Sequence, residues 1–593
     1  VPFLTYNVLS NIDFIRHAFS TKYGGVSTDE WTSMNFAFSR GDKPENVIEN
    51  YKIFSDAVGF DYDSLVTSSQ DHHTFVRPVT KKECGIGIWR EKDIQSVIEN
   101  IINHKKQQLG VDKASNLLSA LAVSAGTTAG DWYAFSVGRL GIDDDYFSYL
   151  TALQDYVESK YKTADKLDKT KSTEWHRIAL TVLSLGGDPT AFGKDTKGNS
   201  INLISDGTYN RANLSQQGIN SCIWALITLD SSNYAVPDSA LNTRESIIDK
   251  IISYQADDGG FSANNGEGSV DITAMAVQAL APYADKSSDK YEKYKKHNAD
   301  KAVDKALSWL SRQQQTDGSF KQDGEACAES TAQVLTALCC SKIDAVNDSR
   351  FIKNGNNALD GIMLFKTENG GFSHTMGKGA NAIAEQQVLY SLCALYRMWG
   401  GYNTLYDITD ENNSGEITNI FTDKKVSPKV EFNDYDVQQY KGLPENLTTE
   451  YYSKVLILYK KLLAADNADS HKSEEKDLKE KLDYLTSLRT EIEDINSIIA
   501  NKLYPFDNIS QGDKELIDSL CSRADKLSEY DQKQILGIDN LRQAQAELNT
   551  RQSTTAVTAA VTVLVVLLVV VLLIGIVRKR KSNKQQQPEN DEW

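Results

Sequence analysis

Two adjacent histidines, His72 and His73 in the stretch QDHHT, are the residues whose type most directly suggests metal chemistry. Imidazole is a common metal ligand, and a stable zinc site generally takes at least three protein ligands. The chain has seven cysteines, but none of them form a Cys-x-x-Cys pair. Most stand in apolar helical stretches such as TALCCSKI, where a thiol is usually buried and inert. His72 is therefore a single candidate metal ligand without a recognisable ligand set around it.

A second group of polar residues recurs at one position of a repeated segment. Each copy begins with an acidic or amide residue and continues through an apolar, alanine-rich stretch to a leucine nine positions later. The starts are 43 to 58 residues apart, which leaves room for two helices and two loops in each repeat. The copies are DWYAFSVGRL from Asp131, EWHRIALTVL from Glu174, QGINSCIWAL from Gln217, DITAMAVQAL from Asp271, ESTAQVLTAL from Glu329 and, less regularly, EQQVLYSLCA from Glu385.

These repeated segments are expected to be the inner helices of a ring. An acid in the first turn meets the exposed amide groups of a helix N-terminus, and a segment that is apolar on nearly every face is typical of a buried helix. More amphipathic segments such as VDKALSWLSRQQ supply outer helices, which end at DDGGF, TDGSF and ENGGF, where glycine lets the chain reverse. The pattern predicts a mainly α fold in which six helical hairpins close into an (α/α)6 toroid.

Closing the ring would gather polar and aromatic side chains at one end of the toroid. Two roles for them are open: helix capping with interhelical hydrogen bonds, or the lining of a central cavity that binds a small molecule. Trp132, Trp175 and Trp224 are expected either to form an aromatic wall of that cavity or to pack in the core. The candidate residues are Asp131, Trp132, Glu174, His176, Tyr209, Arg211, Gln217, Asp271, Glu329, Glu385 and Gln386.

The helix, DGGF turn and acidic inner helix together resemble the prenyltransferase and squalene-cyclase repeat, over residues 94–410. Stretches such as AGTTAGDWYAFSVGRLG are similar in particular to surface-located bacterial toroids. In protein prenyltransferases, an Asp-x-Cys at the start of one inner helix and a later His bind zinc. Here Asp271 and Glu329 are each followed two residues on by threonine, and Glu385 stands near the His position. The Asp-x-Asp-Asp acid of terpene cyclases is absent too.

The resemblance therefore implies the fold without implying one of its known activities. We expect a module that binds a small molecule or a surface partner without evident catalysis, and an isoprenoid-processing enzyme with unrecognised motifs is the alternative. The formal net charge of -17 argues against nucleic acid as a partner.

Residues 1–93 follow different rules, with short mixed apolar runs and turn signals typical of an α/β segment. HAFSTKYGGVS, SMNFAFSRGDKPENVIENY and SSQDHHTFV resemble the first third of the laccase-domain family of multicopper polyphenol oxidoreductases, which is also associated with purine nucleoside phosphorolysis. The resemblance implies that His72 is one of three metal ligands, but the family's Cys and later His have no counterpart, and the similarity stops near Trp89. We expect a truncated, inactive segment that requires no cofactor. Zinc or copper would bind only if another chain completed it, and phosphorylase or oxidoreductase activity is the alternative.

The C-terminal part is predicted to anchor the protein in a membrane. A polar linker over 411–447 leads to a charged helical stalk or bundle over 448–552. Residues 553–577 contain an uncharged apolar run long enough to span a bilayer. Because four basic residues follow at once, the tail 578–593 is expected in the cytoplasm, with the bulk of this single-pass protein outside the cell membrane. That topology needs an export signal, and VPFLTYNVLSNIDF does not have the pattern of one.

Overall fold

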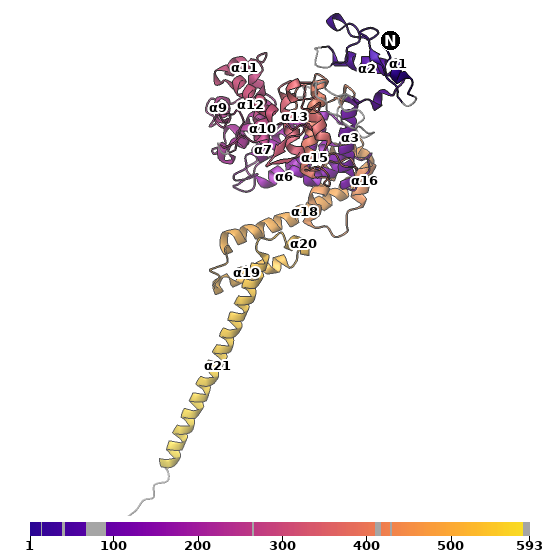
Figure 1. The fold of residues 1–593 in the computed structure, drawn as a ribbon. Helices are drawn as coiled ribbons and strands as arrows, with labels where there is room; N and C mark the ends of the chain where they lie inside the picture. Colours follow the sequence, from indigo (N-terminus) through magenta and orange to yellow (C-terminus); the bar gives the residue numbers. More distant parts are fainter. Residues whose placement is uncertain are drawn as a thin grey trace, which may run out of the picture. The chain divides into compact units, whose positions relative to one another are not determined.

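The computed structural model describes residues 1–12, 15–37, 42–66, 91–263, 266–409, 417–426 and 430–584 (Figure 1). Contacts within the chain divide it into two compact units, Val1–Glu431 and Phe432–Trp593. The predicted metal ligand His72 lies outside the described residues. The described fold is mainly α, with strands only in short antiparallel hairpins, and this confirms the predicted fold class.

Six helices of the described chain form a closed ring in the first unit. Each of them packs against the next one along the sequence, and the last, α15, packs against the first, α5. This closure is the predicted toroid. The inner helices are α5 (Thr128–Leu140), α7 (Thr173–Ser184), α8 (Ile219–Asp230), α10 (Val270–Ala284), α13 (Ala328–Cys340) and α15 (Ala382–Trp399).

The acids that open the sequence repeat stand where a helix N-terminus favours negative charge. Asp131, Glu174, Asp271, Glu329 and Glu385 are all in the first turns of inner helices. The amide of the third repeat differs, because it ends a short 3-10 turn that precedes the glycine cap of α8.

An outer layer covers the ring. Helix α3 packs on α15, α9 on α8, α12 on α10 and α14 on α13, while α6 is tied to α5 by the bond from the Tyr149 hydroxyl to Asp131. The outer partner of α7 is a single π-helical turn, Ser205–Tyr209, in place of a regular helix. The outer helices are α3 (Glu91–Gln108), α6 (Tyr146–Lys160), α9 (Arg244–Ile252), α12 (Ala299–Gln313) and α14 (Ala358–Met363), with shorter helices α4 (Leu117–Leu121) and α11 (Asp289–Tyr294) beside them.

The turns at DDGGF, TDGSF and ENGGF connect outer helices to inner ones. Gly259 has a φ of 99°, and the matching glycines of the other two turns also have positive φ, which glycine adopts without steric cost. The phenylalanine that ends each turn is fully buried. The amide of Phe261 donates to Thr273 Oγ1 at 2.8 Å, and that of Phe320 to Thr331 Oγ1 at 3.1 Å. The threonines that follow the repeat acids therefore hold the turns against the inner helices.

Short elements flank the toroid in the first unit. The N-terminal segment holds a hairpin and two helices, so it combines α and β elements as its turn signals indicate. A second hairpin, β3–β4, leads directly into α13. The elements are β1 (Phe3–Leu4), α1 (Asn7–Ser10), β2 (Phe19–Ser20), α2 (Pro44–Val58), β3 (Lys321–Gln322), β4 (Glu325–Ala326), β5 (Ile417–Asn419) and β6 (Lys424–Val426).

The second unit is a helical bundle that continues into one long helix, α21. Apolar residues of α18, α19 and α21 form its core, including Ile495, Leu520 and Leu541. Its first helix, α16, and the hairpin β5–β6 lie in the range predicted as a linker. The helices are α16 (Asp434–Lys441), α17 (Tyr452–Ala464), α18 (Lys472–Ile498), α19 (Lys514–Ala524), α20 (Glu529–Gln532) and α21 (Ile538–Lys584).

Helix α21 carries the predicted membrane anchor. Within the described residues, it is the one helix long and apolar enough to cross a bilayer (Figure 1). The side chains of its apolar run are exposed. The N-terminal part of the same helix packs in the bundle through Leu541 and Leu548. The predicted stalk and the predicted anchor are therefore joined by unbroken helix, without a loop between them.

Candidate functional site

The inner helices surround a cavity of about 300 Å3, which we call the axial cavity. All six of them contribute side chains, mostly from their first two or three turns. The cavity is therefore at the end of the toroid where the repeat acids stand. Its lining residues are Thr128 and Trp132 of α5, Thr173, Glu174 and Arg177 of α7, Asn220 and Trp224 of α8, Met275 of α10, Gln333 of α13, and Ile383, Gln386, Gln387 and Tyr390 of α15.

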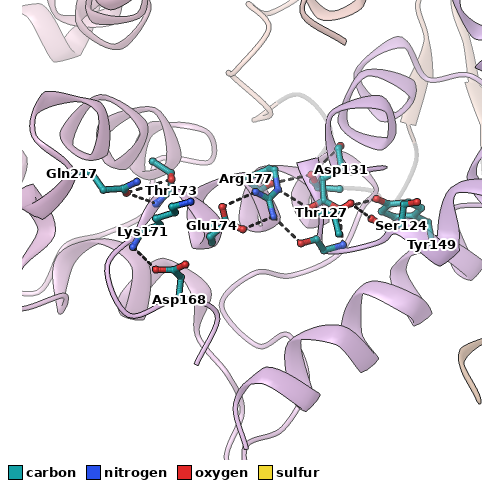
Figure 2. Close-up of polar contacts among 12 residues, drawn as sticks. Ser124, Thr127, Asp131, Tyr149, Asp168, Lys171, Thr173, Glu174, Arg177 and Gln217 are labelled. Carbon is teal, nitrogen blue, oxygen red and sulfur yellow. Dashed lines mark hydrogen bonds and ion pairs between the residues drawn. The ribbon is translucent and has the colours of Figure 1, made fainter. Parts of the chain in front are cut away.

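A buried ion-pair network forms one wall of the axial cavity (Figure 2). The Arg177 guanidinium donates to Asp131 Oδ2 at 2.8 Å, to both Glu174 oxygens at 3.0 and 2.8 Å, and to the Gly126 carbonyl at 2.8 Å. Asp131 is fully buried, and its other oxygen accepts from the Tyr149 hydroxyl at 2.8 Å and from the Gly126 amide. Burial raises the pKa of Asp131, and the guanidinium opposes that rise. The network links two repeat acids through Arg177, a residue whose role the repeat pattern does not indicate.

Aromatic rings form the inner end of the axial cavity. The ring centroids of Trp132 and Trp224 are 5.2 Å apart, and Tyr390 lies 5.7 Å from Trp132. Trp175 is not part of this set. It packs on the outer side of α7, where its indole donates to the Tyr161 hydroxyl at 2.8 Å and Arg211 stacks on its ring.

Side-chain amides provide the polar part of the lining. Gln333 donates to Gln387 Oε1 at 3.0 Å and to the Tyr390 hydroxyl, and it accepts from Gln278 at 2.8 Å. The Oδ1 atom of Asn220 is buried and has no hydrogen-bond partner among the described residues. The cavity thus presents rings and amides, with one carboxylate and one guanidinium that bind each other.

The predicted site residues divide into several groups. Trp132, Glu174 and Gln386 line the axial cavity, and Asp131 reaches it through Arg177. Gln217 accepts from the Thr173 amide at 3.3 Å (Figure 2).

Three other predicted residues have structural partners in the outer layer. His176 is fully buried and bonds the Gly207 carbonyl at 2.9 Å, and burial lowers its pKa to about 3, so it is a neutral core histidine. Arg211 donates to the Asp168 and Lys169 carbonyls. The carbonyl of Tyr209 accepts from the Asn242 amide.

Glu385 is also turned toward other partners. Its carboxylate is fully buried, with Oε1 2.8 Å from His104 Nδ1 of α3 and Oε2 accepting from the Tyr133 hydroxyl at 2.9 Å. The repeat position of Glu385 matches that of Asp131, yet its contacts join α15 to α3 and α5 and do not reach the cavity lining.

The remaining two predicted acids belong to a group at the start of α13. One potential ligand atom each from Cys327, Glu329 and His374 lie within 4.8 Å of one another, and we call these three residues the α13 cluster. Asp271 interacts with Glu329 and His374, and burial raises its pKa. The sequence placed Glu329 in this region, but Cys327 and His374 were missed, since nothing in the linear pattern brings position 374 next to position 327.

A larger cavity of about 750 Å3 lies at the other end of the inner helices. It is lined by residues at the ends of α8, α10 and α13, such as Asp230, Asp285 and Cys340, together with Tyr406. The ring of Tyr406 is 5.8 Å from that of Trp224, so aromatic contacts connect the linings of the two cavities.

Comparison with known proteins agrees with this architecture. Residues 204–410 match the family model of the prenyltransferase alpha-alpha toroid domain, a range that contains the inner helices from α8 to α15. Residues 16–107 match the family model of the multi-copper polyphenol oxidoreductase laccase. Both predicted resemblances are thereby confirmed. The laccase match continues beyond Trp89 to include α3, the helix that packs on α15. No curated protein matches the chain.

Proposed function

We propose that this protein is a membrane-anchored binding module whose toroid holds a small, electrically neutral molecule in the axial cavity without transforming it. The observation that supports this most strongly is the composition of the cavity lining, in which aromatic rings and side-chain amides face the cavity. Arg177 is the one cation among the described lining residues, and its donors already bind other groups of the protein. Concave sites with an apolar wall and a few polar groups are where proteins generally bind small ligands.

The state of Arg177 argues against an isoprenoid diphosphate as the ligand. Diphosphate recognition uses arginine or lysine side chains that are free to donate to the phosphate oxygens. Arg177 already donates to Asp131, Glu174 and the Gly126 carbonyl. Drawing it away would leave Asp131 fully buried without a counter-charge, at a cost of about 3 to 5 kcal/mol.

The size of the cavity limits the ligand further. A volume of 300 Å3 equals that of about ten water molecules. One substituted six-membered ring or a short isoprenyl chain fills such a space, whereas a corrinoid would insert only a part of its structure. The free Oδ1 of Asn220 can accept a hydrogen bond from a ligand hydroxyl.

The placement of the protein is part of the same proposal. Helix α21 acts as a single-pass anchor in the cell membrane, the basic residues from Arg578 to Lys581 stay in the cytoplasm, and the toroid is displayed outside. Surface display would expose the toroid to an extracellular ligand or partner.

The laccase-family match favours a second candidate function, metal-dependent phosphorolysis of purine nucleosides or polyphenol oxidation. The ligand predicted for it, His72, lies outside the described residues, and a Cys and a second His would have to come from elsewhere. Phosphate-dependent release of base from inosine that is lost in His72→Ala would establish this function.

The binding proposal is tested by thermal unfolding of the full chain in lipid nanodiscs with a panel of probes. The panel comprises neutral oligosaccharides, a corrinoid and the matched pair farnesol and farnesyl diphosphate, which differ in charge at one end. A neutral probe at about 100 times its Kd stabilises the first unit by about 2.7 kcal/mol. Trp132→Ala and Gln386→Ala are expected to remove the shift, whereas Gln107→Ala, on the exposed face of α3, keeps it.

Two results would contradict the proposal. One is turnover of an isoprenoid diphosphate by the purified chain. The other is a ligand shift that stays the same in both cavity variants, since binding would then occur at another place.

A further inference from the structure

We propose that Cys327, Glu329 and His374 form a binding site for a divalent metal ion of the zinc class, with one coordination position open. Their potential ligand atoms lie within 4.8 Å of one another. Zinc takes thiolate, imidazole and carboxylate ligands at about 2.0 to 2.3 Å, which puts neighbouring ligands of a tetrahedral site about 3.6 Å apart. Movements of roughly 1 Å by the side chains would bring the three ligand atoms to the spacing that a bound ion requires.

The backbone around the α13 cluster is held in place before any ion binds. Cys327 is the N-cap of α13, in extended conformation, and its amide donates to the Phe320 carbonyl of the preceding turn. The next amide, of Ala328, donates to the carbonyl of His374 at 3.0 Å. This bond fastens the segment that carries the histidine to the helix that carries the thiol and the carboxylate.

The three residues of the cluster have partners, and the unpaired polar atom beside them, within the described residues, belongs to Asp271. Glu329 Oε2 lies 2.8 Å from His374 Nδ1, and Cys327 Sγ lies 3.0 Å from Ser330 Oγ. Ser330 also interacts with the Asp271 carboxylate, whose Oδ1 atom is buried and has no hydrogen-bond partner in the described part of the chain. The carboxylates of Glu329 and Asp271 and the buried thiol of Cys327 thus lie together, and the His374 imidazole is the one group among these four residues that can carry a positive charge. A cation is the group that this arrangement lacks.

An ion pair between Glu329 and His374 does not by itself explain the site. Such a pair requires neither the thiol of Cys327 at the N-cap nor the carboxylate of Asp271, which has an unpaired oxygen. The metal also does not follow the ligand positions that the family resemblance implies. The residues two places after the repeat acids are Thr273 and Thr331, whose hydroxyls bind the turn backbone. The thiol of this cluster comes from two places before the acid.

The site is accessible and open. The His374 side chain is 55% exposed and that of Glu329 12%, while Cys327 is buried, so an ion can enter from the solvent on the histidine side. Three protein ligands leave a fourth position for water or for a donor atom of a ligand, the arrangement of reactive zinc sites. Gln333, which lines the axial cavity, follows Cys327 by six residues, or about 9 Å along α13.

The test is metal binding by the full chain in nanodiscs after treatment with a chelator and exchange into metal-free buffer. Zinc is titrated by calorimetry, and cobalt(II) is added to a second sample to observe the thiolate-to-cobalt absorption that reports a Co–S bond. One equivalent of zinc and the cobalt–thiolate band are expected for the wild type. Cys327→Ser should lose the band, and His374→Ala should weaken zinc binding at least about 100-fold, beyond the range for second-shell changes.

The matched control is Cys340→Ser, at the opposite end of the same helix. It should bind zinc and show the band as the wild type does. His374→Ala changes a largely exposed side chain, so it keeps the test decisive if Cys327→Ser does not fold. Wild-type protein that binds no zinc at micromolar concentration, or binding that is equal in the wild type and His374→Ala, would overturn the proposal.

Discussion

Replacing Arg177 by methionine tests the ion-pair network most directly. The guanidinium is 5% exposed and makes four hydrogen bonds, two to Glu174, one to Asp131 and one to the Gly126 carbonyl. In Arg177→Met, Glu174 can turn toward solvent, since it is 24% exposed, but Asp131 stays fully buried with only a tyrosine hydroxyl and one amide. A buried charge that loses its partner costs about 3 to 5 kcal/mol.

The sign of the pH dependence follows from the same residue. Burial raises the folded-state pKa of Asp131, and without the guanidinium nothing nearby opposes that rise as strongly. A carboxyl whose folded-state pKa exceeds its unfolded value of about 3.9 destabilises most above the folded-state pKa. The cost of Arg177→Met is therefore largest above the folded-state pKa of Asp131 and shrinks as the pH falls toward about 4.

The assay is urea unfolding of the full chain followed by tryptophan fluorescence. Seven of the eight tryptophans precede residue 432, so the signal reports mainly the first unit. Arg177→Met should lose about 3 to 5 kcal/mol, and Arg177→Met combined with Asp131→Asn should lose less, because the second change removes the orphaned charge. Lys342→Met is the control: its pair with Asp285 is 2.8 Å long but the lysine is 67% exposed, so the loss should stay below about 1 kcal/mol. A cost below about 1 kcal/mol for Arg177→Met, or a double variant no more stable than the single one, would refute the reasoning.

Two further predictions concern the buried histidine and the membrane helix. Because burial lowers the folded-state pKa of His176 to about 3, the unfolded chain binds the extra proton between pH 6.5 and 3, and stability falls as the pH drops through this window. His176→Gln should remove about 2 kcal/mol of the loss between pH 7 and pH 5, measured by urea unfolding at both values, and an unchanged loss would contradict the assignment. Val566→Arg together with Val570→Arg puts two charges in the middle of the apolar run of α21, at a cost of about 2.5 to 3.5 kcal/mol each. The double variant should therefore shift from the membrane fraction to the soluble fraction. The control Gln543→Arg, in the packed part of the same helix, should stay in the membrane fraction. Equal membrane fractions for the two variants would show that α21 is not the anchor.

Much of the architecture could be predicted from one-dimensional patterns. A repeat of acid, apolar stretch and leucine indicates helices that are buried on nearly every face. Such helices can bury their apolar surface only by packing on each other and on an outer layer of helices. The DDGGF and TDGSF turns locate the chain reversals, since their glycines need positive φ. The apolar run of α21 also predicts a membrane-spanning helix from the sequence alone, because bilayer thickness sets the length of such a helix.

The site was less predictable, because it depends on contacts between residues far apart in the sequence. Arg177 joins two repeat acids that start different helices, 43 residues apart. The α13 cluster takes its histidine from a loop 47 residues after its cysteine, and a backbone bond from Ala328 to His374 sets their distance. No local spacing rule describes such pairs.

Trp132 and Trp175 show where the sequence stops being informative. Each follows a repeat acid by one residue, so the sequence alone determined that both stand in the first turns of inner helices. In the structure Trp175 is buried, whereas Trp132 is only partly buried. Tertiary structure decided that Trp132 faces the axial cavity while Trp175 packs outward under Arg211. The physical reason is that each residue turns about 100° around a helix, and the rotation of a helix about its own axis is set by the packing of all its neighbours, which the repeat does not encode.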